Sequence, residues 1–247
     1  MLNSIVGLLG TPSGGLPVSG AALWLDASDA TTFSYSSGSL VSQWNDKSGN
    51  GRNFTQATVG LQPTRNTNVQ NGLPALDFNG DLLVNTTYNW GSSASTFFIV
   101  AKENAGGTGY QVILGTGTGA TGQWGYGIGA NPPTDTNQLA IFNIGAGLIK
   151  FNSQMTGSNA DVLAFVTAGY SGSTVVANLF FNGSTDTNNP VTSPSTTTAT
   201  GAVLGAAAGG IEGFISNICE VIIYPSQLST GDRNLVEAYL KTKWGTP

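Results

Sequence analysis

The chain of 247 residues carries 13 acidic and 8 basic side chains, which gives a formal net charge of −5, and charged residues make up only 9% of it. The basic residues are scattered and form no stripe that could neutralise a phosphate backbone, so nucleic acid is excluded as an expected partner. Histidine is absent, which excludes Ser-His-Asp or Cys-His catalysis and an ordinary zinc site, and a single cysteine, Cys219, excludes an internal disulfide.

Residues 1–17 are expected to form an arm that tethers the domain formed by residues 18–247. A short apolar segment precedes a Pro/Gly-rich linker, and exposed apolar side chains of this kind typically bind a partner surface. The alternative is an arm that lies on its own domain. The segment has no basic region and no apolar run of signal-peptide length, so we expect neither export by that route nor membrane insertion. The candidate anchoring residues are Leu2, Ile5, Val6, Leu8 and Leu9.

Residues 21–26 are expected to form the first strand, which would pair near the last strand of the chain. Trp24 and Trp44 are expected in the core, because large aromatic side chains supply much of the interior of a β-protein.

Residues 46–51 read Asp-Lys-Ser-Gly-Asn-Gly, a cluster typical of a tight turn with Asx-type hydrogen bonds. A structural turn is the favoured interpretation. The alternative is a calcium site in which Asp46 and Asn50 act with Asp26 or Asp77, although the carboxylate set of an EF-hand is incomplete. We expect no other cofactor.

Short strands, separated by glycine and Asx turns, are expected to follow one another after Gly80, and such spacing predicts an all-β protein. Two of them are apolar on both faces and should be central, namely residues 97–101 and 162–166. The expected strands are 81–84, 96–102, 110–114, 123–128, 138–143, 148–151, 161–168 and 174–181. Residues 183–200 are polar and of low complexity and are expected to form an exposed loop or edge.

Four aromatic residues are candidates for a platform that binds the C–H faces of a sugar. Each of them is also a candidate core residue. They are Trp90, Trp124, Tyr126 and Tyr170.

Carboxylates are present, but no expected strand carries two of them at alternating positions on one face, where they could act as the paired carboxylates of glycoside hydrolysis. The nearest pairs lie at strand ends or too far apart, and we therefore expect no enzymatic activity and no catalytic residues. Glu220 lies in an apolar strand. The pairs considered are Asp26/Asp29, Asp77/Asp81 and Glu212/Glu220.

The last elements are expected to be a long apolar strand that ends at Pro225 and a helix that follows Ser229. Ser229 with Asp232 is a variant of the capping box, and Gly245 lies just beyond the last turn. The expected apolar stripe of the helix consists of Leu235, Val236, Tyr239 and Leu240.

This C-terminal unit, Ile-Ser-x-Ile-x-Glu-Val-Ile-Ile-Tyr followed by Leu-Ser and a helix ending in Lys-Trp, resembles the end of concanavalin A-like (laminin G type) jelly-roll domains. Residues 23–29, 41–51 and 71–80 agree with that resemblance. It implies a two-sheet antiparallel jelly-roll sandwich with one short C-terminal helix. It also implies a structural hydrogen-bonding role for Glu220 in preference to catalysis, because non-enzymatic members carry a glutamate at this position too.

The resemblance, the lack of an export signal and the lack of catalytic groups together favour a non-catalytic phage virion protein: a capsid decoration, head-fibre or tail-fibre module. It would be made in the host cytoplasm, assemble on the particle as an oligomer, bind other virion proteins through its arm and bind cell-surface polysaccharide. A stand-alone bacterial lectin or adhesin is the alternative, and a glycoside hydrolase is the least favoured.

Overall fold

The computed structural model describes the larger part of the chain, namely residues 15–90, 94–103, 110–116, 124–131, 135–143, 147–155, 157, 159–171, 174–194, 200–207, 210 and 213–247. Leu2, Ile5, Val6, Leu8 and Leu9 lie outside these residues, so the arm and its boundary at residue 17 stay a prediction. Leu16 and Val18 do pack against the core, and the Tyr224 hydroxyl donates a hydrogen bond to the Val18 carbonyl at 2.8 Å.

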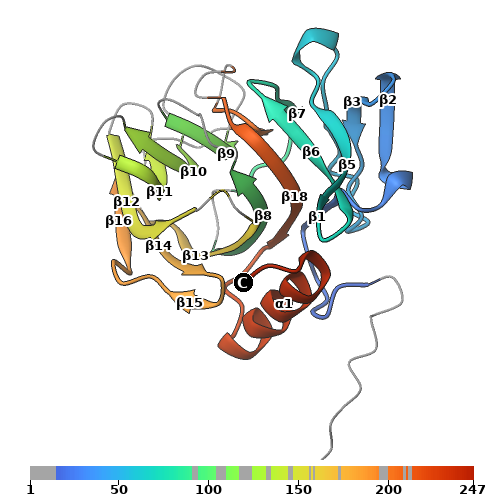
Figure 1. Ribbon diagram of the computed structural model, residues 1–247. Helices are drawn as coiled ribbons and strands as arrows, with labels where there is room; N and C mark the ends of the chain where they lie inside the picture. The colour runs from blue at the N-terminus through green and yellow to red at the C-terminus, as the bar shows by residue number, and fades with distance from the viewer. Residues whose placement is uncertain are drawn as a thin grey trace, which may run out of the picture.

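Within the described residues the chain forms 18 strands of one hydrogen-bonded sheet, with antiparallel pairing between them (Figure 1). The strands are β1 (Leu23–Asp26), β2 (Phe33–Ser37), β3 (Leu40–Trp44), β4 (Phe54–Thr55), β5 (Thr64–Gln70), β6 (Leu73–Asn79), β7 (Leu83–Asn85), β8 (Ser95–Glu103), β9 (Tyr110–Thr116), β10 (Trp124–Asn131), β11 (Asp135–Asn143), β12 (Gly147–Gln154), β13 (Asp161–Ser171), β14 (Thr174–Phe181), β15 (Ser184–Thr185), β16 (Val191–Pro194), β17 (Ala202–Leu204) and β18 (Ile215–Tyr224). Two short 3-10 helices, η1 (Ala30–Thr32) and η2 (Val59–Leu61), and the helix α1 (Thr230–Trp244) complete the described elements. The expected class, antiparallel β with one C-terminal helix, is thereby confirmed.

The centre of the sheet is β8, which pairs with β13 on one side and with β18 on the other. Ile99 of β8 lies opposite Leu163 and opposite Val221, and all three side chains are buried. Apolar residues occur in succession here because both faces of these strands are covered. The prediction that residues 97–101 and 162–166 are central is confirmed.

The first and last strands are partners, as the sequence predicts: Leu23 lies opposite Ile223 and Asp26 lies opposite Glu220. Trp24 and Trp44 are buried, and so is Cys219, whose burial raises the pKa of its thiol. The predicted core positions are therefore confirmed.

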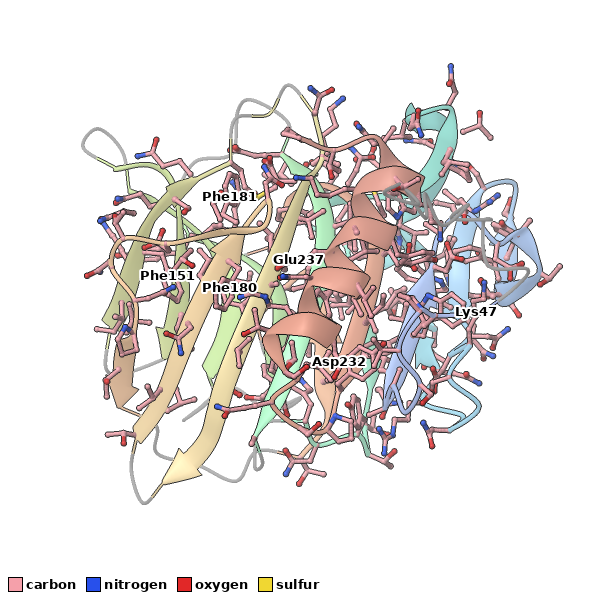
Figure 2. The ribbon with its side chains drawn as sticks, turned by 90° about the horizontal axis from the view of Figure 1, so that it is seen from below. Lys47, Phe151, Phe180, Phe181, Asp232 and Glu237 are labelled. Atoms are coloured by element: carbon pink, nitrogen blue, oxygen red, sulfur yellow. The ribbon has the colours of Figure 1, made fainter. Side chains whose placement is uncertain are left out.

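Helix α1 lies across the outer face of the central strands (Figures 1 and 2). The Ser229 hydroxyl accepts a hydrogen bond from the Asp232 amide at 3.1 Å, and Gly245 ends the helix with a left-handed φ of 61°. The buried stripe consists of Val236, Leu240 and Trp244, at intervals of four residues. Leu235 is 51% exposed, so its placement in the stripe was wrong: it lies about 100° round the helix from Val236.

Arg233 fixes α1 against β14. Its guanidinium carbon lies 3.4 Å from the centroid of the Phe180 ring, and its Nε atom lies 3.5 Å from Oε1 of Glu237. Phe180 and Glu237 lie close together in the view of Figure 2, while Lys47 lies on the opposite side of the helix.

Residues 183–200 were expected to form an exposed loop or edge, and in their described part they form an edge: the short strands β15 and β16 both pair with β14. The Asp186 carboxylate accepts hydrogen bonds from the amides of Asn152 at 3.1 Å and Ser153 at 2.6 Å, which attaches the segment to β12. Asn189 exchanges two side-chain hydrogen bonds with the backbone of Leu179. Hydrogen bonds of polar side chains, rather than apolar contacts, thus hold this segment to the sheet. A polar segment of this kind has no apolar pattern that would predict its strands.

Among the described residues, no helix combines the length and the apolar character that crossing a membrane requires.

Candidate functional site

A pocket of about 640 Å³ lies between the segment that leads into β1, the turn after β3 and the end of β18. Its lining combines apolar side chains with hydrogen-bonding ones and contains neither Asp nor Glu. The lining residues are Gly15, Leu16, Val18, Ser19, Gly20, Ala21, Ala22, Trp24, Lys47, Ser48, Asn50, Arg52 and Pro225.

Asp46 organises the turn that forms one wall of this pocket. Its Oδ1 atom accepts hydrogen bonds from the amides of Trp24 at 3.0 Å and Ser48 at 2.9 Å. Its Oδ2 atom accepts from the Ser48 hydroxyl at 2.8 Å and the Arg52 amide at 3.0 Å. Four donors therefore hold the carboxylate, and the turn folds around it.

Asn50, the second residue of the sequence-predicted calcium site, lies in the same turn and directs its amide nitrogen to the carbonyl of Ala22 at 3.1 Å. The contacts of Asp46 and Asn50 are those of the structural turn that the sequence favours, and Asp77 instead accepts a hydrogen bond from Asn66. In the described part of the chain, no group of three or more His, Cys, Asp or Glu side chains is placed to hold a metal. Calcium at this turn stays an untested prediction.

Two basic side chains line the pocket in fixed positions. Lys47 forms ion pairs of 2.9 Å with both Asp26 and Asp29, and its Nζ atom lies 4.2 Å from the centroid of the Trp24 ring. Burial alone would lower the pKa of Lys47, but its hydrogen bonds to the two carboxylates raise this pKa overall.

Arg52 stacks on Tyr88, with 4.2 Å between its guanidinium carbon and the ring centroid, and its Nη1 atom donates to the Ala22 carbonyl at 2.8 Å. The pocket is thus lined with preoriented donors whose positions do not depend on a ligand. In the sequence, this turn was interpreted only as a source of oxygen ligands for a metal. The basic residues Lys47 and Arg52 were the feature that could have indicated a pocket lined with hydrogen-bond donors.

Of the four aromatic candidates, only Trp90 has a described side chain. It is 3% exposed, its ring meets Phe97 edge-on at 4.8 Å between centroids, and Nε1 donates to the Gly115 carbonyl at 3.4 Å. Trp90 is therefore a core residue. The side chains of Trp124, Tyr126 and Tyr170 lie outside the described part, and their assignment to a sugar platform stays a prediction.

Glu220 is fully buried between β18 and α1, and its carboxylate is saturated with hydrogen bonds. Oε1 accepts from Trp24 Nε1 at 2.7 Å and from the Tyr239 hydroxyl at 3.1 Å. Oε2 accepts from Lys243 Nζ at 2.8 Å and from Trp244 Nε1 at 2.7 Å. Burial raises the pKa of Glu220, while the charge of Lys243 acts to lower it. These contacts join the helix to the sheet, whereas Glu212 lies outside the described residues.

A second buried carboxylate pair consists of Glu103 and Asp161, at the end of β8 and the start of β13. Both are buried, with exposed fractions of 2% and 3%. Burial raises the pKa of Glu103 to about 7, and the neighbouring charge of Asp161 adds to this effect. A pair buried to this degree does not border an open cleft that would admit a polysaccharide.

No protein-family model and no curated protein sequence matches this chain. A Trypanosoma rangeli sialidase in complex with 2,3-difluoro-KDN shares the fold, with a TM-score of 0.62 and 12% identity over 94% of this chain and 34% of the sialidase. Domain 4 of AbnA, a GH43 extracellular arabinanase from Geobacillus stearothermophilus, in complex with arabinotriose, gives a TM-score of 0.53 and 14% identity over 88% of this chain and 98% of that domain. An arabinofuranosidase complexed with arabinofuranosyl-alpha-1,2-xylobiose gives a TM-score of 0.55 and 18% identity over 92% of this chain and 60% of its own.

The chain thus spans about a third of the sialidase and nearly all of the arabinanase domain. At these identities the likeness shows a shared fold. Each of the three structures is a glycoside hydrolase or a domain of one.

The expectation of a non-catalytic phage virion protein was therefore wrong, and so was the expectation that enzymatic activity is excluded. The virion expectation rested on the resemblance of the C-terminal motif. In the structure, the residues of this motif in β18 and α1 bury Glu220 and close the domain. These residues stabilise the fold, and their pattern does not indicate what the domain binds.

Proposed function

We propose that this chain is a carbohydrate-recognition domain of a carbohydrate-active protein and that an oligosaccharide binds in the pocket between residues 15–22 and the turn at 46–52. The observation that carries this proposal is the lining of that pocket, which joins preoriented hydrogen-bonding groups to a small apolar surface. A fold shared with an arabinanase domain that holds arabinotriose supports it.

The chemistry of the pocket suits a sugar. Hydroxyl groups need paired donors and acceptors, which the side chains of Ser48, Asn50 and Arg52 offer. The C–H faces of a sugar ring need apolar contact, which Leu16 and Pro225 offer. The volume of about 640 Å³ lies within the range that binding pockets for small ligands usually have.

We further propose that the strands are arranged as the two-sheet jelly-roll sandwich that the concanavalin A-like resemblance implies. The central strands β8, β13 and β18 carry α1 on one face, and the Phe97 ring on the other face of β8 packs against Trp90. A sheet whose two faces are both covered supports a layered arrangement.

The test is calorimetric titration of the full chain with arabino-oligosaccharides, xylo-oligosaccharides and sialyllactose. We expect saturable binding of at least one of them, weakened about tenfold or more by Asn50→Ala or Arg52→Ala, because truncation removes polar partners of a bound sugar. Asn79→Ala, at an exposed asparagine outside the pocket, is the matched control and should leave the affinity unchanged.

Absence of binding to every sugar would refute the proposal, as would an equal loss of affinity in the Asn79→Ala control. Chromatography of the same mixtures for released sugars shows whether the domain also cleaves what it binds.

A further inference from the structure

Glu103 and Asp161 extend from neighbouring strands onto the same face of the sheet. Asp161 lies directly opposite Ala101, so Glu103, two residues further along β8, is its diagonal neighbour on that face. Diagonal neighbours in an antiparallel pair have Cα atoms about 7 to 8 Å apart, a separation that the longer side chain of Glu103 can span, and the charge of Asp161 acts on Glu103. The two carboxylates therefore share one buried space.

Ser216 of β18 completes the group from the other side of β8. It lies directly opposite Glu103, is fully buried, and its hydroxyl has no hydrogen-bond partner in the described structure. Beside it, Gln111 accepts a hydrogen bond from the Ile215 amide at 2.9 Å, which places the Gln111 side chain against the same strand. Three neighbouring strands thus direct oxygen atoms into one enclosed site.

No basic residue compensates Glu103. All eight Lys and Arg residues of the chain lie in its described part, and none of them forms an ion pair with this carboxylate. Its Oε2 atom is buried and accepts no hydrogen bond in the described structure. Glu220, which is also buried, differs in that four donors saturate its carboxylate.

Asp161 is oriented by a neighbour. Its Oδ1 atom accepts a hydrogen bond from Asn182 Nδ2 at 2.8 Å. The Oδ1 atom of Asn182 in turn accepts a hydrogen bond from the Val162 amide at 2.8 Å, which orients the Asn182 side chain. Such second contacts are how proteins hold a metal-binding carboxylate in place.

We propose that Glu103, Asp161 and Ser216 bind a divalent cation, with Ca²⁺ as the ion of matching chemistry. The side chains offer only hard oxygen ligands, two of them carboxylates, in a site without histidine or thiolate. Ca²⁺ tolerates irregular coordination and accepts backbone and water oxygens as its remaining ligands, whereas Mg²⁺ requires an octahedral shell and gives up its water reluctantly.

The experiment compares thermal unfolding of the chelator-treated full chain with and without CaCl₂ at about 5 mM, a concentration above the range of weak calcium modules. We expect the unfolding midpoint to rise by about 4 °C or more, because the ion binds only the folded state. MgCl₂ should give a smaller rise. Glu103→Gln and Asp161→Asn should each abolish the calcium-dependent rise, and Asp77→Asn, at the half-buried pair with Asp81, should retain it.

Glu103→Gln is nearly isosteric and removes an uncompensated buried charge, so this variant should fold without calcium at least as stably as the unchanged chain. Calorimetric titration with CaCl₂ provides the second measurement. The proposal is overturned if calcium neither raises the midpoint nor gives a binding isotherm with the unchanged chain. It is also overturned if both responses persist in Glu103→Gln and Asp161→Asn, which would place the ion elsewhere, for example at the turn of Asp46.

Discussion

Two buried glutamates show how much the surroundings of a side chain decide. Glu220 receives hydrogen bonds from two tryptophans, a tyrosine and a lysine, and it binds the helix to the sheet. Glu103 is also buried but lacks an ion pair within the described structure. A glutamate thus links the helix to the sheet at position 220 and is a candidate ion ligand at position 103.

Replacing Glu220 tests whether its hydrogen bonds and ion pair hold α1 on the sheet. In Glu220→Gln the amide nitrogen would face indole and ammonium donors, and Lys243 would lose one of its two carboxylate partners. We expect the free energy of unfolding to fall by about 3 to 5 kcal/mol, as for other buried ion pairs that lose one partner. Urea denaturation measures this change. Asp232→Asn, at the exposed start of α1, should cost less than about 1 kcal/mol, and a comparable loss in both variants would contradict the role given to Glu220.

Acid should weaken the contact that fixes Lys47 in the pocket wall. Hydrogen bonds from Thr31 and Lys47 lower the pKa of Asp29 to about 2, below its ordinary value of 3.8. Since the folded-state pKa is depressed, the stabilisation is present above pH 3.8 and is lost as the pH falls towards 2. We expect Asp29→Asn to remove part of the decline in stability over this interval, measured by urea unfolding at several pH values. An unchanged pH profile in this variant would show that Asp29 makes no such contribution.

Helix α1 and strand β18 act as one element. The helix ends are set by local chemistry, with the Ser229 cap and the left-handed Gly245, while its position is set by the stripe of Val236, Leu240 and Trp244 against the sheet. The Glu220 network joins the two elements from within. This explains why the C-terminal unit carries the strongest sequence pattern of the chain: it has to satisfy the requirements of a strand, a turn and a helix within about thirty residues.

Two leucines of α1 provide a matched test of its packing. Leu240 is fully buried and Leu235 is 51% exposed, although the two lie in the same helix. Leu240→Ala should lower the free energy of unfolding by about 2 to 5 kcal/mol, because it leaves a cavity against the sheet. Leu235→Ala should change it by less than about 0.5 kcal/mol. Equal effects in denaturant unfolding would mean that α1 does not pack as described.

At the scale of the molecule, the two proposed sites lie at opposite ends of β18. Pro225 borders the pocket and Ser216 lies opposite Glu103, so nine residues of extended chain, roughly 30 Å, separate them. No described side chain belongs to both sites. The pocket is formed mainly by residues 15–22 and the turn at 46–52, whereas the proposed ion site is formed by the ends of β8, β13 and β18.

We therefore expect the two binding events to be independent. Removing calcium with a chelator should lower the unfolding midpoint yet change the affinity for sugar less than about twofold, since a coupling below roughly 0.4 kcal/mol is expected for sites that share no side chain and lie roughly 30 Å apart. Conversely, Asn50→Ala should retain the full calcium-dependent rise of the midpoint. Calorimetric titration of sugar at two calcium concentrations measures the coupling, and a tenfold change in affinity would contradict independence.

The sequence by itself determined the local features. The all-β class, the helix between Ser229 and Gly245, the burial of Trp24 and Trp44 and the central position of residues 97–101 all follow from patterns within a few residues. Caps, turns and apolar runs act over that range. The aromatic candidate Trp90 shows the limit, because an aromatic residue reads alike in a core and in a sugar site.

Only the tertiary structure decided which residues meet. Glu103, Asp161 and Ser216 come from three strands far apart in the chain, and the pocket joins residues 15–22 to Pro225. Which strands pair, and in which register, is set by the packing of whole faces rather than by any short stretch, and a shift of one residue would turn Glu103 and Ser216 away from each other. For that reason the candidate sites, unlike the class of fold, became visible only once the sheet was assembled.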